Sequence, residues 1–321
     1  MTSFSACGLA VGHATDVDGA TGCTVIRGES GPFQCGVSIA GRATGTRELA
    51  LLDPAHLVTR VDAILLAGGS AYGLDAAAGV MRWMEERAHG FDVGAGVVPI
   101  VPAAVLFDLA PLGQFSARPT PEMAYDACER ASGEHTEEGS VGAGTGATVG
   151  KVAGPAHAMK GGVGCSGLDV GALSVRALAV VNALGDVRDE RGEIVAGARR
   201  ERGGWLDSAA WLANGASERD EFATLAGRST TLCVVATNAA LDRAALAALA
   251  RASTAALYRR ITPVATPFDG DVVFATAPMS GGVPANAAQI EALAVRTLER
   301  AIERAVRTAA PGDVLVEEDA R

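Results

Sequence analysis

The order of the apolar segments is the feature that most constrains this fold. Three segments have the apolar periodicity of helices, and they are residues 72–89, 241–259 and 287–308. Short runs bounded by turn residues are typical of strands, and they are Gly22–Arg27, Cys35–Ala40, Ala63–Ala67, Val97–Pro102, Leu178–Asn182, Leu232–Thr237 and Val272–Thr276. Strands and helices do not alternate regularly, so the order predicts an α+β fold in which layered sheets pack against helices.

Small residues dominate what fills those layers. Of 321 residues 49% are hydrophobic, which is ample for a large core, yet only 4% are aromatic and 40 are glycine. Glycine permits close approach of backbones and tight turns. We therefore expect layers of small side chains, with glycine-rich loops lining a functional site.

Charge and cysteine spacing exclude several classes of function. The net charge is −10 without a cluster of Lys and Arg, which argues against a nucleic-acid partner. Neither a signal-like N-terminus nor a long apolar window is present, so we expect a cytoplasmic protein with no membrane partner. The six cysteines and five histidines are scattered without ligand spacing, which predicts buried free thiols and no metal site.

A glycine-rich stretch at residues 139–151 first suggests a phosphate-binding loop. The spacing of such a loop fails, because Thr145 stands where the first glycine belongs and Val152 follows Lys151. A loose dinucleotide-binding pattern is present, but no clear strand leads into it. Lys151 remains as a single cation beside glycines, either stabilising negative charge in a site or lying solvated in a loop.

A pair of hydroxyl residues, Thr230 and Thr231, runs directly into the predicted strand 232–237. A threonine at a new chain terminus could act as a nucleophile, because its own α-amino group could serve as the base. The residues alone favour two ordinary strand threonines. The polar composition of residues 203–227, just before the pair, fits an accessible processing loop.

Six motifs in a fixed order give the chain a family resemblance. It resembles the P1 family of peptidases, the self-processing N-terminal-nucleophile hydrolases that include L-aminopeptidase/D-amino-acid esterases, β-peptidyl aminopeptidases and nylon-oligomer hydrolases. The motifs are Ala67–Asp75, Gly142–Gly146 with Gly150-Lys151, Lys160–Gly164, Val180–Asp186, Ser229–Leu232 and Phe268–Asp271.

The resemblance implies an αββα sandwich formed by one domain, residues 1–321. It implies autocatalytic cleavage between Ser229 and Thr230, which would give an α chain of residues 1–229 and a β chain of residues 230–321 that stay associated. A homo-oligomer, a tetramer of these heterodimers, is also implied.

Positions that match the family's motifs carry its catalytic roles. Thr230 would attack the scissile carbonyl, while Asn182 would hold the oxyanion as a neutral donor. Asp269 and Asp271 would orient the nucleophile and its ammonium group. Read without the resemblance, Asn182 is a turn-capping residue and Asp269-Gly270 a hairpin turn.

Two further residues match site residues of the family. Lys151 would be an electrostatic partner of Thr230, as in the nylon-oligomer hydrolase branch. Tyr72 would donate to the oxyanion or contact substrate, although its position also suits a partly buried residue that opens a helix.

The expected activity is hydrolysis of peptides or small amides, possibly esters, through an acyl-threonine intermediate and without any metal or organic cofactor. Ser229 replaces the Asn or Gly common before the nucleophile, and Asp269-Gly270-Asp271 replaces the Ser-x-Glu of the aminopeptidase branch. Three alternatives stay open. They are a nylon-oligomer-type (6-aminohexanoate) amide hydrolase, an acetyl transferase similar to the ornithine enzymes, and an uncleaved non-catalytic member.

Overall fold

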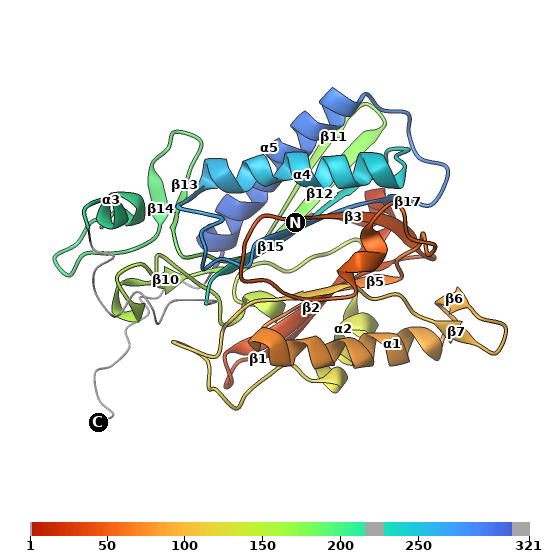
Figure 1. The fold of residues 1–321 in the computed structure, drawn as a ribbon, viewed down its shortest axis with the longest axis horizontal. Helices are drawn as coiled ribbons and strands as arrows, with labels where there is room; N and C mark the ends of the chain where they lie inside the picture. Colours follow the sequence, from red (N-terminus) through yellow and green to blue (C-terminus); the bar gives the residue numbers. More distant parts are fainter. Residues whose placement is uncertain (1, 216–227, 310–321) are drawn as a thin grey trace.

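The chain forms four layers, in which two sheets lie face to face between two pairs of helices (Figure 1). The computed structural model describes residues 2–215 and 228–309. One five-stranded sheet has the order β11-β12-β15-β17-β3 and the other β1-β2-β5-β8-β4. This arrangement is the αββα sandwich expected from the sequence.

The first sheet is built around a central strand, β15 (Thr230–Thr237). On one side β15 pairs antiparallel with β12 (Leu173–Asn182), and on the other it pairs parallel with β17 (Val272–Pro278). The outer strands are β11 (Gly162–Val170) and β3 (Phe33–Ile39). Helices α4 (Arg243–Arg260) and α5 (Ala287–Arg307) cover the outer face of this sheet (Figure 1).

The second sheet contains β1 (Leu9–Asp16), β2 (Thr21–Gly28), β5 (Ala63–Ala67), β8 (Ala103–Val105) and β4 (Gly45–Arg47). Its outer face packs on α1 (Ala77–Glu85) and α2 (Pro121–Arg130). Shorter elements are η1 (Ser5–Cys7), η2 (Leu49–Leu52), η3 (Ser70–Ala76), β6 (Phe91–Asp92), β7 (Val97–Val98), η4 (Gly142–Gly144), β9 (Thr148–Val149), η5 (Pro155–His157), β10 (Met159–Lys160), β13 (Asp186–Arg188), β14 (Ile194–Ala196), α3 (Ser208–Ala213) and β16 (Ile261–Thr262).

Burial on both faces explains why β15 has no polar alternation. Leu232 and Val234 face the core between the two sheets, whereas Cys233 and Val235 face the core beneath α4 and α5. A strand covered on both sides needs apolar residues at every position. All six cysteines are free and buried, as the sequence predicts.

Several predicted elements differ from those observed. The expected strand at residues 97–102 is only β7, because Pro99 and Pro102 cannot donate to a ladder, and β8 begins at Ala103. The expected helix at residues 72–89 is η3 followed by α1, and it ends before Ala88, which has a φ of 55°. Strands β1 and β11 and helix α2 were not predicted.

Part of the expected processing loop is ordered secondary structure, since α3 falls inside it. Residues 216–227 of the expected loop lie outside the described residues. Across residues 2–215 and 228–309, we find no helix with the length and apolar character to span a membrane.

Candidate active site

Three segments that are far apart in the sequence meet at the N-terminal end of β15. Thr230, the first residue of β15, pairs in register with Asn182, the last residue of β12. Ser229 forms a parallel bridge with Asp269, just before β17. The sheet order therefore brings the predicted nucleophile, the predicted neutral donor and the predicted carboxylates together at one end of the central strands.

Lys151 reaches the same place through the turn that follows β12. Its own N–H donates to the carbonyl of Leu184 (2.9 Å), and the N–H of Gly150 donates to that of Gly185 (3.1 Å). Gly150 has a φ of 71°, and a Cβ there would lie 2.0 Å from the nitrogen of Ala198. Only glycine fits this position, so the glycine before the lysine fixes where the lysine enters the site.

Two hydrogen bonds converge on the carbonyl oxygen of Ser229, immediately before Thr230. The Thr230 hydroxyl donates to it at 2.6 Å, and the Gly270 N–H donates to it at 2.8 Å. A Cβ at Gly270 would lie 2.7 Å from Thr230 Oγ1, which leaves room for glycine alone. A fixed backbone donor thus polarises the carbonyl that lies next to the hydroxyl.

Lys151 is buried, with 5% of its surface exposed, and within the described part of the chain its ammonium group contacts neutral oxygens alone. Its Nζ donates to Asn182 Oδ1 (2.9 Å), to the carbonyl of Asn182 (3.1 Å) and to the carbonyl of Arg228 (2.8 Å). Burial lowers the pKa of Lys151 to about 7, against the opposing effect of the nearby carboxylates. The site therefore holds a cation that can change its charge near neutral pH.

The Asn182 side chain is fully buried and its amide is held at both ends. Its Oδ1 accepts from Lys151 and from the N–H of Thr148 (3.0 Å). Its Nδ2 donates to the carbonyls of Phe107 (3.0 Å) and Arg228 (3.3 Å). These partners fix which end of the amide faces the residues before Thr230.

Both carboxylates are buried and accept backbone hydrogen bonds. Asp271 accepts from the N–H groups of Thr231 (2.6 Å) and Ala265 (3.2 Å), and Asp269 Oδ2 accepts from that of Thr266 (2.8 Å). Asp269 Oδ1 has no hydrogen-bond partner within the described part of the chain. Burial raises the pKa of both groups, that of Asp271 to about 7 with a further contribution from the charge of Asp269.

Tyr72 lies on η3 and is 53% exposed. The Arg118 guanidinium lies 3.5 Å from the centre of its ring, and Phe115 packs edge-on at 6.5 Å. Tyr72 and Arg118, together with Thr46 and Arg47, line an open cleft of about 760 Å³. None of the contacts found for Tyr72 joins it to Thr230, Lys151 or Asn182.

A second buried pair of charged residues supports the site and has no counterpart among the residues chosen from the sequence. Asp108 accepts from the N–H of Gly69 and the hydroxyl of Thr21, both at 2.7 Å. Lys160 donates to three backbone carbonyls, including that of Ala147 (3.1 Å). Burial raises the pKa of Asp108 to about 6 and lowers that of Lys160 to about 7.

Backbone groups beside Asp108 and beside an acceptor of Lys160 hold Asn182. Phe107, which precedes Asp108, supplies a carbonyl to Nδ2, and Thr148, which follows Ala147, supplies an N–H to Oδ1. Lys160 was within a recognised glycine motif, whereas Asp108 belonged to none. Backbone donors and acceptors such as those of Phe107, Thr148 and Gly270 leave no signal in the side-chain pattern.

Comparisons with known proteins identify the family of the chain. The model of Peptidase family S58 matches residues 6–314. An uncharacterized aminopeptidase of Mycobacterium tuberculosis is 41% identical over 304 residues, covering 90% of this chain and 85% of that protein. A 6-aminohexanoate-oligomer endohydrolase of Agromyces is 31% identical over 281 residues, covering 86% of this chain and 74% of that protein.

Solved structures show the same fold at low sequence identity. The L-aminopeptidase D-Ala-esterase/amidase of Ochrobactrum anthropi, described as a variant of the Ntn hydrolase fold, superposes with a TM-score of 0.69 at 18% identity, covering 94% of this chain and 84% of that one. A Burkholderia β-aminopeptidase gives a TM-score of 0.66 at 19% identity, covering 93% and 84%.

Proposed function

The chain belongs to peptidase family S58 and is a hydrolase of amide bonds, and we propose that Thr230 is its nucleophile, created by cleavage of the Ser229–Thr230 bond. The observation that carries the proposal is the pair of hydrogen bonds on the Ser229 carbonyl. The hydroxyl that would attack this carbonyl lies 2.6 Å from its oxygen, and the Gly270 N–H occupies the place of an oxyanion donor.

Self-cleavage would begin when Thr230 Oγ bonds to the Ser229 carbonyl carbon. The carbonyl oxygen takes up negative charge beside the Gly270 N–H, the C–N bond breaks, and the Thr230 nitrogen leaves as an amine with the proton that Oγ has lost. Water then hydrolyses the resulting ester. The products are a carboxylate on Ser229 and a Thr230 that carries both a free hydroxyl and a free amine.

The same atoms would then hydrolyse a substrate amide. Thr230 Oγ attacks the substrate carbonyl, its amine accepts the hydroxyl proton and passes it to the departing amine, and water releases the acyl group. The Gly270 N–H would hold the negative charge, with the charge of Lys151 one residue away at the Arg228 carbonyl, and Asp269 Oδ1, which has no partner in the described structure, would accept from the new ammonium group. Tyr72 receives no step here, because its contacts lie at the open cleft with Arg118 and Phe115.

The position of β15 supports lasting association of the two chains. Cleavage would make Thr230 the first residue of the β chain, yet β15 pairs with β12 of the α chain along its length and with β17 of its own chain. The new N-terminus would therefore remain at the end of the central strand, beside Lys151 and Asn182.

The test is the intact mass of purified protein after prolonged incubation, with N-terminal sequencing of any fragment. We expect a fragment that begins at Thr230 in the wild type and none in Thr230→Ala. Thr231→Ala is the matched control, because Thr231 is equally buried and the variant keeps the backbone N–H that donates to Asp271, so it should still be cleaved. Cleavage in Thr230→Ala, or an intact wild type without amide turnover, would contradict the proposal.

A further inference from the structure

Two successive carbonyls before Thr230 are held by donors from other parts of the fold. The carbonyl of Ser229 accepts from Gly270, and that of Arg228 accepts from Lys151 Nζ (2.8 Å) and Asn182 Nδ2 (3.3 Å). The chain before the nucleophile thus occupies a row of hydrogen-bond donors in the way that the acyl part of a bound peptide would.

These donors do not depend on the segment they hold. Without Arg228, Lys151 would keep its two bonds to Asn182, and Asn182 Nδ2 would keep its bond to the carbonyl of Phe107. After cleavage the Ser229 end of the α chain would no longer be tethered to Thr230, and the contacts of Lys151 with Asn182 and of Asn182 with Phe107 would hold the donors in place. Buried donors that lose an acceptor cost about 1–3 kcal/mol each, so a ligand that returns a carbonyl to this position is favoured.

Resting on the function proposed above, we propose that the Arg228 carbonyl marks a substrate subsite. There, Lys151 and Asn182 would bind the carbonyl one residue before the scissile bond. The substrates would then be peptides or oligoamides cut at an internal amide bond. An acyl residue with a free α-ammonium group would bring no carbonyl to these donors, and it would place a second cation near Lys151.

One group in the site could favour an ammonium instead. Asp269 Oδ1 is buried without a partner in the described structure, and Asp271 also lies near Lys151. The mature chain, however, supplies its own ammonium group at Thr230, directly beside the Ser229–Asp269 bridge. We therefore assign this carboxylate to the nucleophile and the Lys151–Asn182 pair to the substrate.

Ser229 indicates the size of the acyl residue that precedes the cut. Its side chain is buried, and its hydroxyl has no hydrogen-bond partner within the described residues. The residues around Ser229 thus enclose a small side chain and form no hydrogen bond with its hydroxyl in the described structure. Alanine is therefore a suitable acyl residue for probes.

The test compares three p-nitroanilides on mature protein whose cleavage has been verified by mass. N-acetylalanine p-nitroanilide carries an additional carbonyl in its acetyl group, and alanine p-nitroanilide carries an ammonium group. N-propionyl-p-nitroaniline, the propionic compound, carries neither. We expect kcat/KM for the acetylated compound to exceed that of each of the others by at least about tenfold, the value of one hydrogen bond to a charged donor. Equal values for the acetylated and propionic compounds, or preference for the ammonium compound, would overturn the subsite.

Binding of the products separates this inference from the proposed function. If mature protein turns over none of the anilides, the amide-hydrolase chemistry proposed for Thr230 fails, and the subsite is judged by thermal stabilisation with N-acetylalanine against propionate. Greater stabilisation by N-acetylalanine supports the subsite. Equal stabilisation by the two acids overturns it.

Discussion

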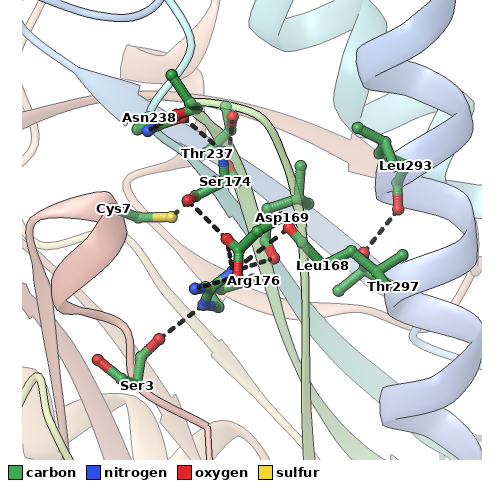
Figure 2. Close-up of polar contacts among 12 residues, drawn as sticks. Ser3, Cys7, Leu168, Asp169, Ser174, Arg176, Thr237, Asn238, Leu293 and Thr297 are labelled. Atoms are coloured by element: carbon green, nitrogen blue, oxygen red, sulfur yellow. Dashed lines mark hydrogen bonds and ion pairs between the residues drawn. The ribbon is translucent and has the colours of Figure 1, made fainter.

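Strand β12 has a buried cation at each end, and the two cations are held in different ways. Near its start, Arg176 forms hydrogen bonds to both carboxylate oxygens of Asp169 (2.8 and 3.2 Å) and to the carbonyl of Ser3 (2.8 Å), as Figure 2 shows. At its end, the contacts of Lys151 with residues that the structure describes are those with the amide oxygen of Asn182 and the carbonyl oxygens of Asn182 and Arg228.

The difference decides what each cation can do. Arg176 has its counter-charge in direct contact, and a guanidinium stays protonated, so it acts as a permanent clamp between the N-terminal segment and the β11–β12 hairpin. Lys151 is desolvated and has no carboxylate in contact among residues 2–215 and 228–309, so its pKa falls to about 7. The buried ion pair of Arg176 therefore contributes to stability. Lys151, with its lowered pKa, can instead gain or lose a proton near neutral pH.

Replacing the unpaired cation should have the largest effect. We expect Lys151→Met to lower the rate of self-cleavage, and kcat of any mature protein, by about 10²–10³-fold, because a charged donor near the reacting carbonyl is lost. Mass spectrometry over time and steady-state kinetics would measure both rates. Rates within twofold of the wild type would remove Lys151 from the site.

Replacing the paired cation should act on stability instead. We expect Arg176→Met to lower the free energy of unfolding by about 2–3 kcal/mol, because the carbonyls of Ser3 and Val175 lose their charged donor. Urea denaturation of the uncleaved Thr230→Ala background would measure this. The rate of self-cleavage in the Arg176 variant should stay at the wild-type value, and a slower rate would show that the two ends of β12 are coupled.

The pH dependence of stability should also separate the two cations. The pKa of Lys151 is about 7 in the folded chain and 10.5 ordinarily, so between these values the unfolded chain holds a proton that the folded chain has released. Unfolding free energy should therefore rise with pH in this window, by at most about 1.4 kcal/mol per unit, and this contribution is constant below pH 7.

Urea denaturation at several pH values from about 7.5 to about 9.5, inside that window, would show this rise. The slope should fall in Lys151→Met, where the similar contribution of Lys160 remains, and it should be unchanged in Arg176→Met. An unchanged slope in the lysine variant would mean that Lys151 keeps its ordinary pKa.

The smallest effect is expected for the partner of the clamp. The Asp169 side chain is 57% exposed, so Asp169→Asn should cost only about 0.5–1 kcal/mol of unfolding free energy. Arg176 lowers the pKa of Asp169, which means that this loss should disappear as the pH falls below the carboxylate's titration. A loss that persists at low pH would show that shape rather than charge holds the hairpin.

Local sequence signals predicted the elements well and the site unevenly. The strands around β5, β15 and β17 follow from short runs of buried residues, and helices α4 and α5 from their periodicity. What local patterns missed are elements defined by distant neighbours. Strand β11, for example, is rich in glycine because residues of α5 pack directly on its backbone.

The site residues show the same division. From its neighbours alone Lys151 could equally be a loop lysine, and its burial comes from the turn after β12. Asp269-Gly270 has the sequence of a hairpin turn, yet Gly270 is required because Thr230 lies against it. Asp108 could not have been chosen, because its importance comes from contacts with Gly69 and Thr21 on other strands and loops.

The central place of β15 has a consequence for how the protein folds. Before cleavage, β12 and β15 belong to one chain, and their pairing is an intramolecular event. After the proposed cleavage, the same sheet could form only by association of two polypeptides, so refolding would become bimolecular and would depend on concentration. The uncleaved chain should refold on dilution from denaturant at any protein concentration, whereas the mature protein should recover its fold more completely as the concentration of the two chains rises.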